Sequence, residues 1–120
     1  MNFLWVFLGG GAGSILRYGI GLLAQKLPTT LPVATFISNL SACFIFGICL
    51  SVLQQKEISS ASLRLLILTG FCGGLSTFST FGYETYLLMA RGQLNYAILN
   101  SVFSVAACIT IFYLFRINIQ

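Results

Sequence analysis

Residues 69–82 read TGFCGGLSTFSTFG and lie in the middle of an apolar stretch, residues 62–90, that is long enough to cross a bilayer. Each glycine inside a helix costs roughly 1 kcal/mol relative to alanine. Hydroxyl groups beside these glycines can bond backbone groups that an interruption would leave without partners. They belong to Thr69, Ser76, Thr77, Ser79 and Thr80. The stretch therefore predicts two half-helices that meet at mid-membrane.

The rest of the chain has the composition of an integral membrane protein. Of its 120 residues, 58% are hydrophobic and 7% are charged, whereas about 25% of the residues of a soluble domain are charged. So few charges exclude a water-soluble globule. A hydrocarbon core of about 30 Å takes about 20 helical residues to cross, and four stretches qualify: residues 3–24, 32–53, 62–90 and 94–115. We predict an all-α membrane protein, a single domain over residues 1–120, with four transmembrane helices and a broken third one.

The ionisable residues exclude most catalytic chemistry. Histidine and aspartate are absent, and the two carboxylates are Glu57 and Glu84, so a histidine-based triad or an H-E-x-x-H metal site is impossible. The four cysteines have no C-x-x-C spacing and lie in apolar stretches, where a thiol usually packs as a small hydrophobe. The net charge of +4 comes from basic residues scattered singly along the chain, which argues against a nucleic-acid partner. No enzyme is expected.

The basic residues also fail to set an orientation in the membrane. An even number of spans places both termini on one side, together with Lys56, Arg64 and Arg116. Lys26 and Arg91 fall on the other side, joined by Arg17 if its head reaches that interface. Because basic residues fix topology through their imbalance, this near tie favours a protein inserted in both orientations and assembled as an antiparallel homodimer. One fixed topology stays open as the alternative.

Polar side chains inside the spans mark functional positions, because burying them in lipid is costly. Asn39 lies mid-span in the second stretch, one turn after Thr35, and Tyr96, Asn100 and Ser104 form a stripe at four-residue spacing on the fourth. These groups are neutral hydrogen-bond donors, which suit an anion. Phe78 and Phe81 share a helix face, and the positive edges of their rings can approach an anion. Ordinary ring packing for the phenylalanines and interhelical bonding for Asn39 stay open.

Two glycine pairs have the spacing of close helix contacts. Gly9 and Gly13 in the first stretch, and Gly70 and Gly74 in the third, match the G-x-x-x-G pattern. Small residues at this spacing let two membrane helices approach at backbone distance. For the first pair we predict packing.

These motifs resemble those of the Fluc (CrcB) fluoride channels over essentially the whole chain. Residues 70–81, GFCGGLSTFSTF, are similar to the family's GFCGGLTTFSTF and differ only at Ser76. Residues 9–18, GGGAGSILRY, are similar to its first-helix motif, and Asn39 stands at the place of its second-helix asparagine. The family usually has glycine three residues after that asparagine, where this chain has Ala42.

The resemblance implies a dual-topology antiparallel homodimer with two fluoride pathways in a bacterial plasma (inner) membrane. Phe78 and Phe81 would coordinate fluoride through their ring edges, and Asn39 would donate its amide. The polar groups along each pathway would be Thr35, Thr77, Ser79, Thr80, Tyr96, Asn100 and Ser104. Backbone carbonyls of Gly73 and Ser76 from both subunits would hold a structural sodium ion at the dimer centre. Arg17 and Glu84 would support the pore vestibules. The expected partners are fluoride, sodium, membrane lipid and a second copy of the chain.

Two other interpretations remain. A proton-coupled transporter of the small multidrug-resistance type shares the length and the four spans, but it needs a carboxylate within the membrane. The first stretch has none, and Glu84 lies several residues beyond the predicted break. A passive scaffold subunit would leave the glycine-rich interruption and its hydroxyl groups without a purpose.

Overall fold

The computed structural model describes residues 1–55 and 60–115, and within these ranges every regular element is a helix. The elements, in chain order, are α1 (Asn2–Ala24), α2 (Val33–Gln55), α3 (Ala61–Arg64), η1 (Leu65–Cys72), α4 (Gly73–Leu75), α5 (Phe78–Ala90) and α6 (Leu94–Leu114). Lys56, Glu57 and Arg116, which entered the charge count, lie outside the described residues.

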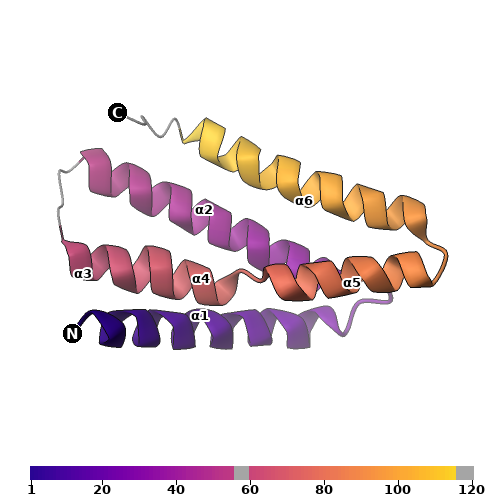
Figure 1. The fold of residues 1–120 in the computed structure, drawn as a ribbon, viewed down its shortest axis with the longest axis horizontal. Helices are drawn as coiled ribbons and strands as arrows, with labels where there is room; N and C mark the ends of the chain where they lie inside the picture. Colours follow the sequence, from indigo (N-terminus) through magenta and orange to yellow (C-terminus); the bar gives the residue numbers. More distant parts are fainter. Residues whose placement is uncertain (56–59, 116–120) are drawn as a thin grey trace.

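The prediction of an all-helical membrane protein with four apolar spans is confirmed. Four segments are long and apolar enough to cross a membrane: Asn2–Ala24, Val33–Gln54, Ala61–Ala90 and Leu94–Leu114. Their ends fall within a residue or two of the predicted ones. They run side by side in a molecule of 49 × 29 × 20 Å, and the start of α1 and the end of α6 lie at the same end (Figure 1).

The third span changes backbone conformation along its length. α3, capped by the Ser60 hydroxyl, which accepts a hydrogen bond from the Leu63 amide, continues directly into the π-helical turns of η1 and then into α4. Ser76 (φ −76°, ψ 156°) and Thr77 (φ −152°, ψ 115°) are extended. α5 then begins at Phe78, and the Thr77 hydroxyl accepts a hydrogen bond from the Thr80 amide. The chain therefore leaves the helix after the glycines, since Gly73 and Gly74 are themselves helical.

The glycines form the contact between α1 and the first half of the third span. A Cβ added to Gly9 or Gly13 would collide with the carbonyl oxygens of Leu66 and Phe71, respectively, and one added to Gly74 would collide with the carbonyl of Gly10. The predicted packing role of Gly9 and Gly13 therefore holds in the structure. We call this contact of α1 with η1 and α4 the glycine seam.

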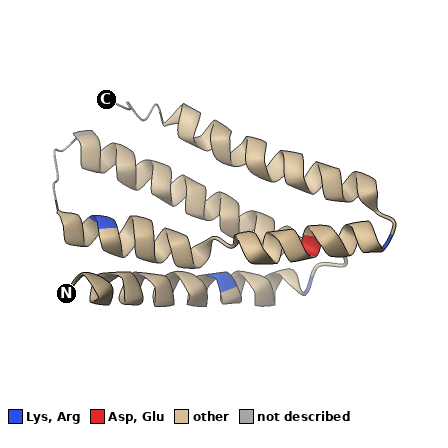
Figure 2. Cartoon of the chain, viewed as in Figure 1, with Lys and Arg blue, Asp and Glu red and all other residues tan. Residues whose placement is uncertain are grey.

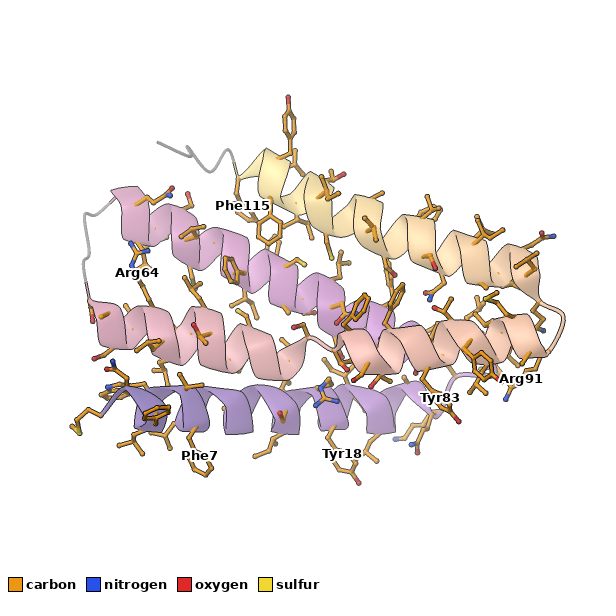
Figure 3. The ribbon with its side chains drawn as sticks, viewed as in Figure 1. Phe7, Tyr18, Arg64, Tyr83, Arg91 and Phe115 are labelled. Carbon is orange, nitrogen blue, oxygen red and sulfur yellow. The ribbon has the colours of Figure 1, made fainter. Side chains whose placement is uncertain are left out.

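The outer faces of the molecule are apolar. Phe7 and Tyr18 point away from the neighbouring helices on α1, and Tyr83 projects from α5 (Figure 3). Charged positions are few along the whole ribbon (Figure 2). Contiguous apolar surface of this extent marks contact with lipid or with a protein partner, in agreement with a multi-pass membrane protein.

Candidate functional site

Asn39 of α2 holds the extended segment of the third span. Its Oδ1 accepts a hydrogen bond of 2.7 Å from the Thr77 amide, and its Nδ2 donates one of 3.4 Å to the Thr77 carbonyl. In an uninterrupted helix the Thr77 amide would bond the carbonyl four residues earlier, that of Gly73. The side chain of Asn39 thus replaces a helical hydrogen bond, and one N–H of its amide has no partner among the described residues.

A second carbonyl at the interruption is bonded from α1. The Arg17 Nε lies 3.0 Å from the Gly74 oxygen, and the Ser14 Oγ lies 3.4 Å from it. Helical continuation would have given this oxygen the Phe78 amide as its partner. The guanidinium of Arg17 therefore turns inward toward the third span, so Arg17 does not join the basic residues at the helix ends.

A polar cavity of about 380 Å³ opens on one side of Asn39 and Thr77. Its walls come from α1, α2, α5 and the extended segment. The residues that line it are Ser14, Arg17, Tyr18, Gly21, Leu22, Gln25, Ala34, Thr35, Ser38, Thr77, Thr80 and Glu84. It brings together five predicted residues: Arg17, Thr35, Thr77, Thr80 and Glu84.

The two charged side chains of the polar cavity are not bonded to each other. Oε2 of Glu84 is buried and has no hydrogen-bond partner, and among the described residues no ion pair joins this carboxylate to Arg17. The guanidinium keeps donors besides the Nε–H that bonds Gly74. The cavity therefore presents both a cationic donor and an acidic acceptor beside the Asn39 amide.

An aromatic cavity of about 320 Å³ lies on the other side of the same junction. The residues that line it are Asn39, Cys43, Ser76, Thr77, Phe78, Phe81, Ser104, Val105, Cys108 and Ile109. The ring centroids of Phe78 and Phe81 are 6.0 Å apart, with the planes inclined by 34°. Ser104 is buried and its hydroxyl has no partner. Thr77 lines both cavities, and Asn39, which bonds the Thr77 backbone, lines the aromatic one.

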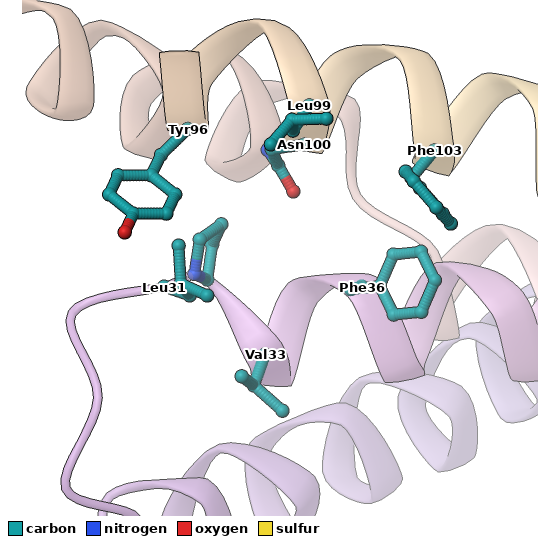
Figure 4. Close-up of a pocket in the computed structure, with 8 residues that line it drawn as sticks. Leu31, Val33, Phe36, Tyr96, Leu99, Asn100 and Phe103 are labelled. Carbon is teal, nitrogen blue, oxygen red and sulfur yellow. The ribbon is translucent and has the colours of Figure 1, made fainter. Parts of the chain in front are cut away.

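The predicted stripe on the fourth helix divides between two cavities. Ser104 faces the aromatic cavity, whereas Tyr96 and Asn100 line a separate, mostly apolar cavity of about 310 Å³. Figure 4 shows these two side chains on α6 pointing toward the segment at Leu31, while Phe103 of α6 lies opposite Phe36. The Asn100 Nδ2 donates a 3.2 Å hydrogen bond to the Thr85 hydroxyl of α5, so this amide joins two helices.

The other predicted residues lie near the interruption. Ser79 is exposed, on the turn that contains Phe78. Gly73 and Ser76 line a smaller cavity of about 170 Å³ between α2, α6 and the third span. Gly73 is exposed, and a Cβ built on it would meet nothing within 4 Å.

Sequence reasoning missed two serines that the structure places at the polar cavity. Ser38 is 1% exposed and its Oγ has no partner, although the hydroxyl lies beside Asn39 in the cavity wall. Ser14 bonds the Gly74 carbonyl. The sequence does carry a signal for Ser38, because it follows Thr35 by three residues and so shares its helix face.

Comparison with known proteins identifies the family. The model of the family described as CrcB-like protein, Camphor Resistance (CrcB), matches residues 4–115. This chain belongs to the CrcB-like family. Curated relatives include a protein of Acidobacterium capsulatum, 43% identical over 100 residues (82% of this chain, 80% of the relative). A Methylobacterium protein is 44% identical over 107 residues (89% and 86%), and one of Klebsiella pneumoniae is 40% identical over 95 residues (79% and 75%).

All three CrcB-like relatives carry the name fluoride-specific ion channel FluC. The resemblance inferred from residues 70–81 is therefore confirmed. The matched segment contains the glycine seam, both cavities and the Asn39–Thr77 junction.

Proposed function

We propose that this chain is the subunit of a fluoride channel that carries the ion passively across the plasma (inner) membrane of a bacterium. The observation that carries the proposal is that Thr77, whose backbone Asn39 bonds, lines both the polar and the aromatic cavity. The names of the CrcB-like relatives support the choice of ion, and their bacterial sources support the location. Passive flow involves no covalent step, so the chain is a channel and not an enzyme.

The order of chemical groups supports conduction of a small anion. Fluoride would enter the polar cavity, where the Arg17 guanidinium and the hydroxyls of Thr35 and Thr80 can replace part of its water shell. It would then pass the free N–H of Asn39. In the aromatic cavity it would meet the positive ring edges of Phe78 and Phe81, followed by the unpartnered hydroxyl of Ser104. Beyond Arg17 the donors along the path are neutral, which allows an ion to enter and also to leave.

A proton-coupled transporter is not favoured. The described carboxylate, Glu84, shares its cavity with Arg17, which provides a place for an anion beside it. The CrcB-like relatives are named as channels specific for fluoride.

We infer that the channel is an antiparallel, dual-topology homodimer. Phe78 is 85% exposed in the single chain, so the aromatic cavity lacks a wall that a second copy would provide. Among the described loop and helix-end residues, Lys26 and Arg91 lie at one end of the bundle and Arg64 at the other, which leaves insertion with little charge bias. The interruption at Ser76 and Thr77 would then lie at mid-membrane, near the two-fold axis of the dimer.

A structural sodium ion at the dimer centre fits the residues present. Asn39 takes the amide that would otherwise bond the Gly73 carbonyl, and Ser76 is extended. Backbone carbonyls released where a helix unwinds are ligands for Na⁺ in membrane proteins. The carbonyls of Gly73 and Ser76 from two chains would supply four oxygens, with no contribution from the Ser76 side chain.

The test of the proposed function is ion efflux from liposomes. Vesicles that contain the purified protein and are loaded with fluoride should release it far faster than matched vesicles loaded with chloride. Equal rates for the two anions would refute fluoride selectivity. Dual topology is tested separately, by labelling single cysteines introduced into each loop of a cysteine-free variant. Each position should react from both sides of the membrane, and labelling from one side alone would contradict the antiparallel dimer.

A further inference from the structure

Two cysteines that are distant in sequence line the same wall of the aromatic cavity. Cys43 follows Asn39 by one turn of α2, and Cys108 follows Ser104 by one turn of α6. Residues four apart share a helix face, so each thiol lies beside a polar group of the proposed fluoride pathway. Both side chains therefore face one cavity from two neighbouring helices.

Aromatic contacts fix the spacing of α2 and α6 next to these thiols. The rings of Phe46 and Phe112 pack edge to face, with centroids 5.8 Å apart and planes at 89°. Phe46 lies three residues after Cys43, and Phe112 lies four residues after Cys108. Packing on the adjacent turn therefore fixes the distance between the two helices that carry the thiols.

The surroundings supply two protein ligands and no more. Within residues 1–55 and 60–115 no group of three or more His, Cys, Asp or Glu side chains is placed to hold a metal ion. Structural zinc takes four such ligands in a tetrahedron, so this pair does not suit zinc. Soft thiolate ligands select soft cations, and the ions that need only two of them are d¹⁰ cations with linear coordination, namely Hg²⁺, Ag⁺ and Cu⁺.

We propose that Cys43 and Cys108 form a two-thiolate site for a soft, linearly coordinated metal cation, and that its occupation blocks the aromatic cavity. Binding of a divalent ion replaces two of its water or halide ligands by two metal–sulfur bonds. Each thiol loses its proton to the solvent, and no atom changes oxidation state. The bound ion would lie in the aromatic cavity, one helical turn from Asn39 and Ser104, in the space that the rings of Phe78 and Phe81 also line. The predicted block of fluoride efflux rests on the proposed channel function, whereas binding of the metal to the two cysteines does not.

The experiment uses the full-length protein and HgCl₂ as the probe, with two matched double variants. Cys49→Ser/Cys72→Ser keeps only the proposed pair, and Cys43→Ser/Cys108→Ser removes it. Binding is followed in detergent by the ultraviolet absorption of the mercury–thiolate bond. The first variant should bind one Hg²⁺ per chain and release two protons per ion. Single replacement of Cys43 or Cys108 by serine should weaken binding at least 100-fold, because one thiolate remains.

Fluoride efflux is measured on the same variants, each relative to its own rate without metal. One equivalent of Hg²⁺ per chain should abolish most of the efflux of Cys49→Ser/Cys72→Ser, and an excess of a dithiol chelator should restore it. Cys43→Ser/Cys108→Ser should be unaffected, and the alanine version of this pair provides a second test if the serine version does not fold.

Three results would overturn the proposal: equal inhibition of both double variants, failure of Cys49→Ser/Cys72→Ser to bind Hg²⁺, or binding at the pair without loss of efflux. If no variant carries fluoride at all, the absorption titration still decides the metal site. In that case the proposed channel function fails independently of the site.

Discussion

The two sides of the third span are packed in different ways. On one side α1 meets η1 and α4 at the glycine seam, where backbone lies directly against backbone. On the open side, away from the seam, the polar cavity lies between α1, α2 and α5, the aromatic cavity between α2, α5 and α6, and the apolar cavity between α2 and α6. Close packing leaves no room for an ion or a water molecule, whereas the open side offers space and unpaired polar groups. Under the proposed function, the seam would provide structural support and the side that contains Asn39 would conduct the ion.

The largest effect is expected when the seam is forced apart. Gly13→Val would place a side chain against the Phe71 carbonyl, and overpacking of this kind typically costs about 1–3 kcal/mol. We expect a large drop in the melting temperature of the protein in detergent and loss of the proposed dimer. Circular dichroism and size-exclusion chromatography measure these effects.

Gly11→Ala is the matched control for the seam, because a Cβ at Gly11 meets nothing within 4 Å and alanine favours helix. Its melting temperature should be unchanged or slightly higher. If Gly13→Val were as stable as Gly11→Ala, the close backbone contacts of the glycine seam would not be needed for stability.

A smaller change in stability but a large change in transport is expected on the open side. Phe81→Ile removes a ring whose edge faces the proposed pathway while keeping an apolar side chain of similar bulk. We expect fluoride efflux from liposomes to fall at least tenfold, which corresponds to about 1.4 kcal/mol on the barrier. Assembly should be unchanged by size-exclusion chromatography.

Phe7→Ile makes the same substitution on the outer face of α1, where the ring points away from the neighbouring helices (Figure 3). Its efflux should equal that of the unmodified protein. If Phe81→Ile also released fluoride at the rate of the unmodified protein, Phe81 would not belong to the pathway. The functional contrast between the glycine seam and the open side would then be weaker.

The four spans could be predicted from the sequence because length and hydropathy are sufficient to recognise a membrane-spanning helix. The sequence also predicted the importance of residues 69–82, but it attributed the interruption to the glycines. In the structure Gly73 and Gly74 stay helical, Gly74 packs in the seam, and Ser76 and Thr77 become extended instead. The π-helical turns of η1 were not predicted, because no local preference distinguishes them from an α-helix.

The partners of the interrupted backbone could not be predicted from local sequence. The neighbouring hydroxyls were expected to bond it, and Thr77 does accept from Thr80. The other bonds come from Asn39 on α2 and from Arg17 and Ser14 on α1. These contacts join residues more than 35 positions apart, so they depend on how the helices pack. The same holds for Tyr96 and Asn100, which share a face with Ser104 but line a different cavity.

A modest effect is expected from the unpaired carboxylate on the open side. Glu84→Gln keeps the shape of the side chain and removes a negative charge from the polar cavity. Because like charges repel across a partly hydrated space, we expect fluoride efflux to rise about two- to fivefold at low ionic strength, equivalent to about 0.5–1 kcal/mol. The increase should shrink in high salt, which screens the charge.

Glu84→Asp is the control for that measurement, because it shortens the side chain and keeps the charge. Its efflux should remain at or below the unmodified rate at every salt concentration. If Glu84→Gln conducted no faster than Glu84→Asp at low salt, the carboxylate would not face the ion, and the polar cavity would lose its place on the conducting side.

The smallest effect on transport is expected at Asn100, because its structural contact differs from its predicted role. Asn100 was predicted as part of the polar path, yet its amide bonds Thr85 and ties α6 to α5. If that bond is its function, Asn100→Ala and Thr85→Val should each lower the free energy of unfolding by about 0.5–1.5 kcal/mol. The double variant should then be no worse than either single one, and efflux should change less than twofold. Ser104→Ala should instead slow efflux at unchanged stability, because its hydroxyl is unpartnered in the aromatic cavity. A loss of efflux in Asn100→Ala that Thr85→Val does not reproduce would return Asn100 to the pathway and extend the conducting side to the apolar cavity.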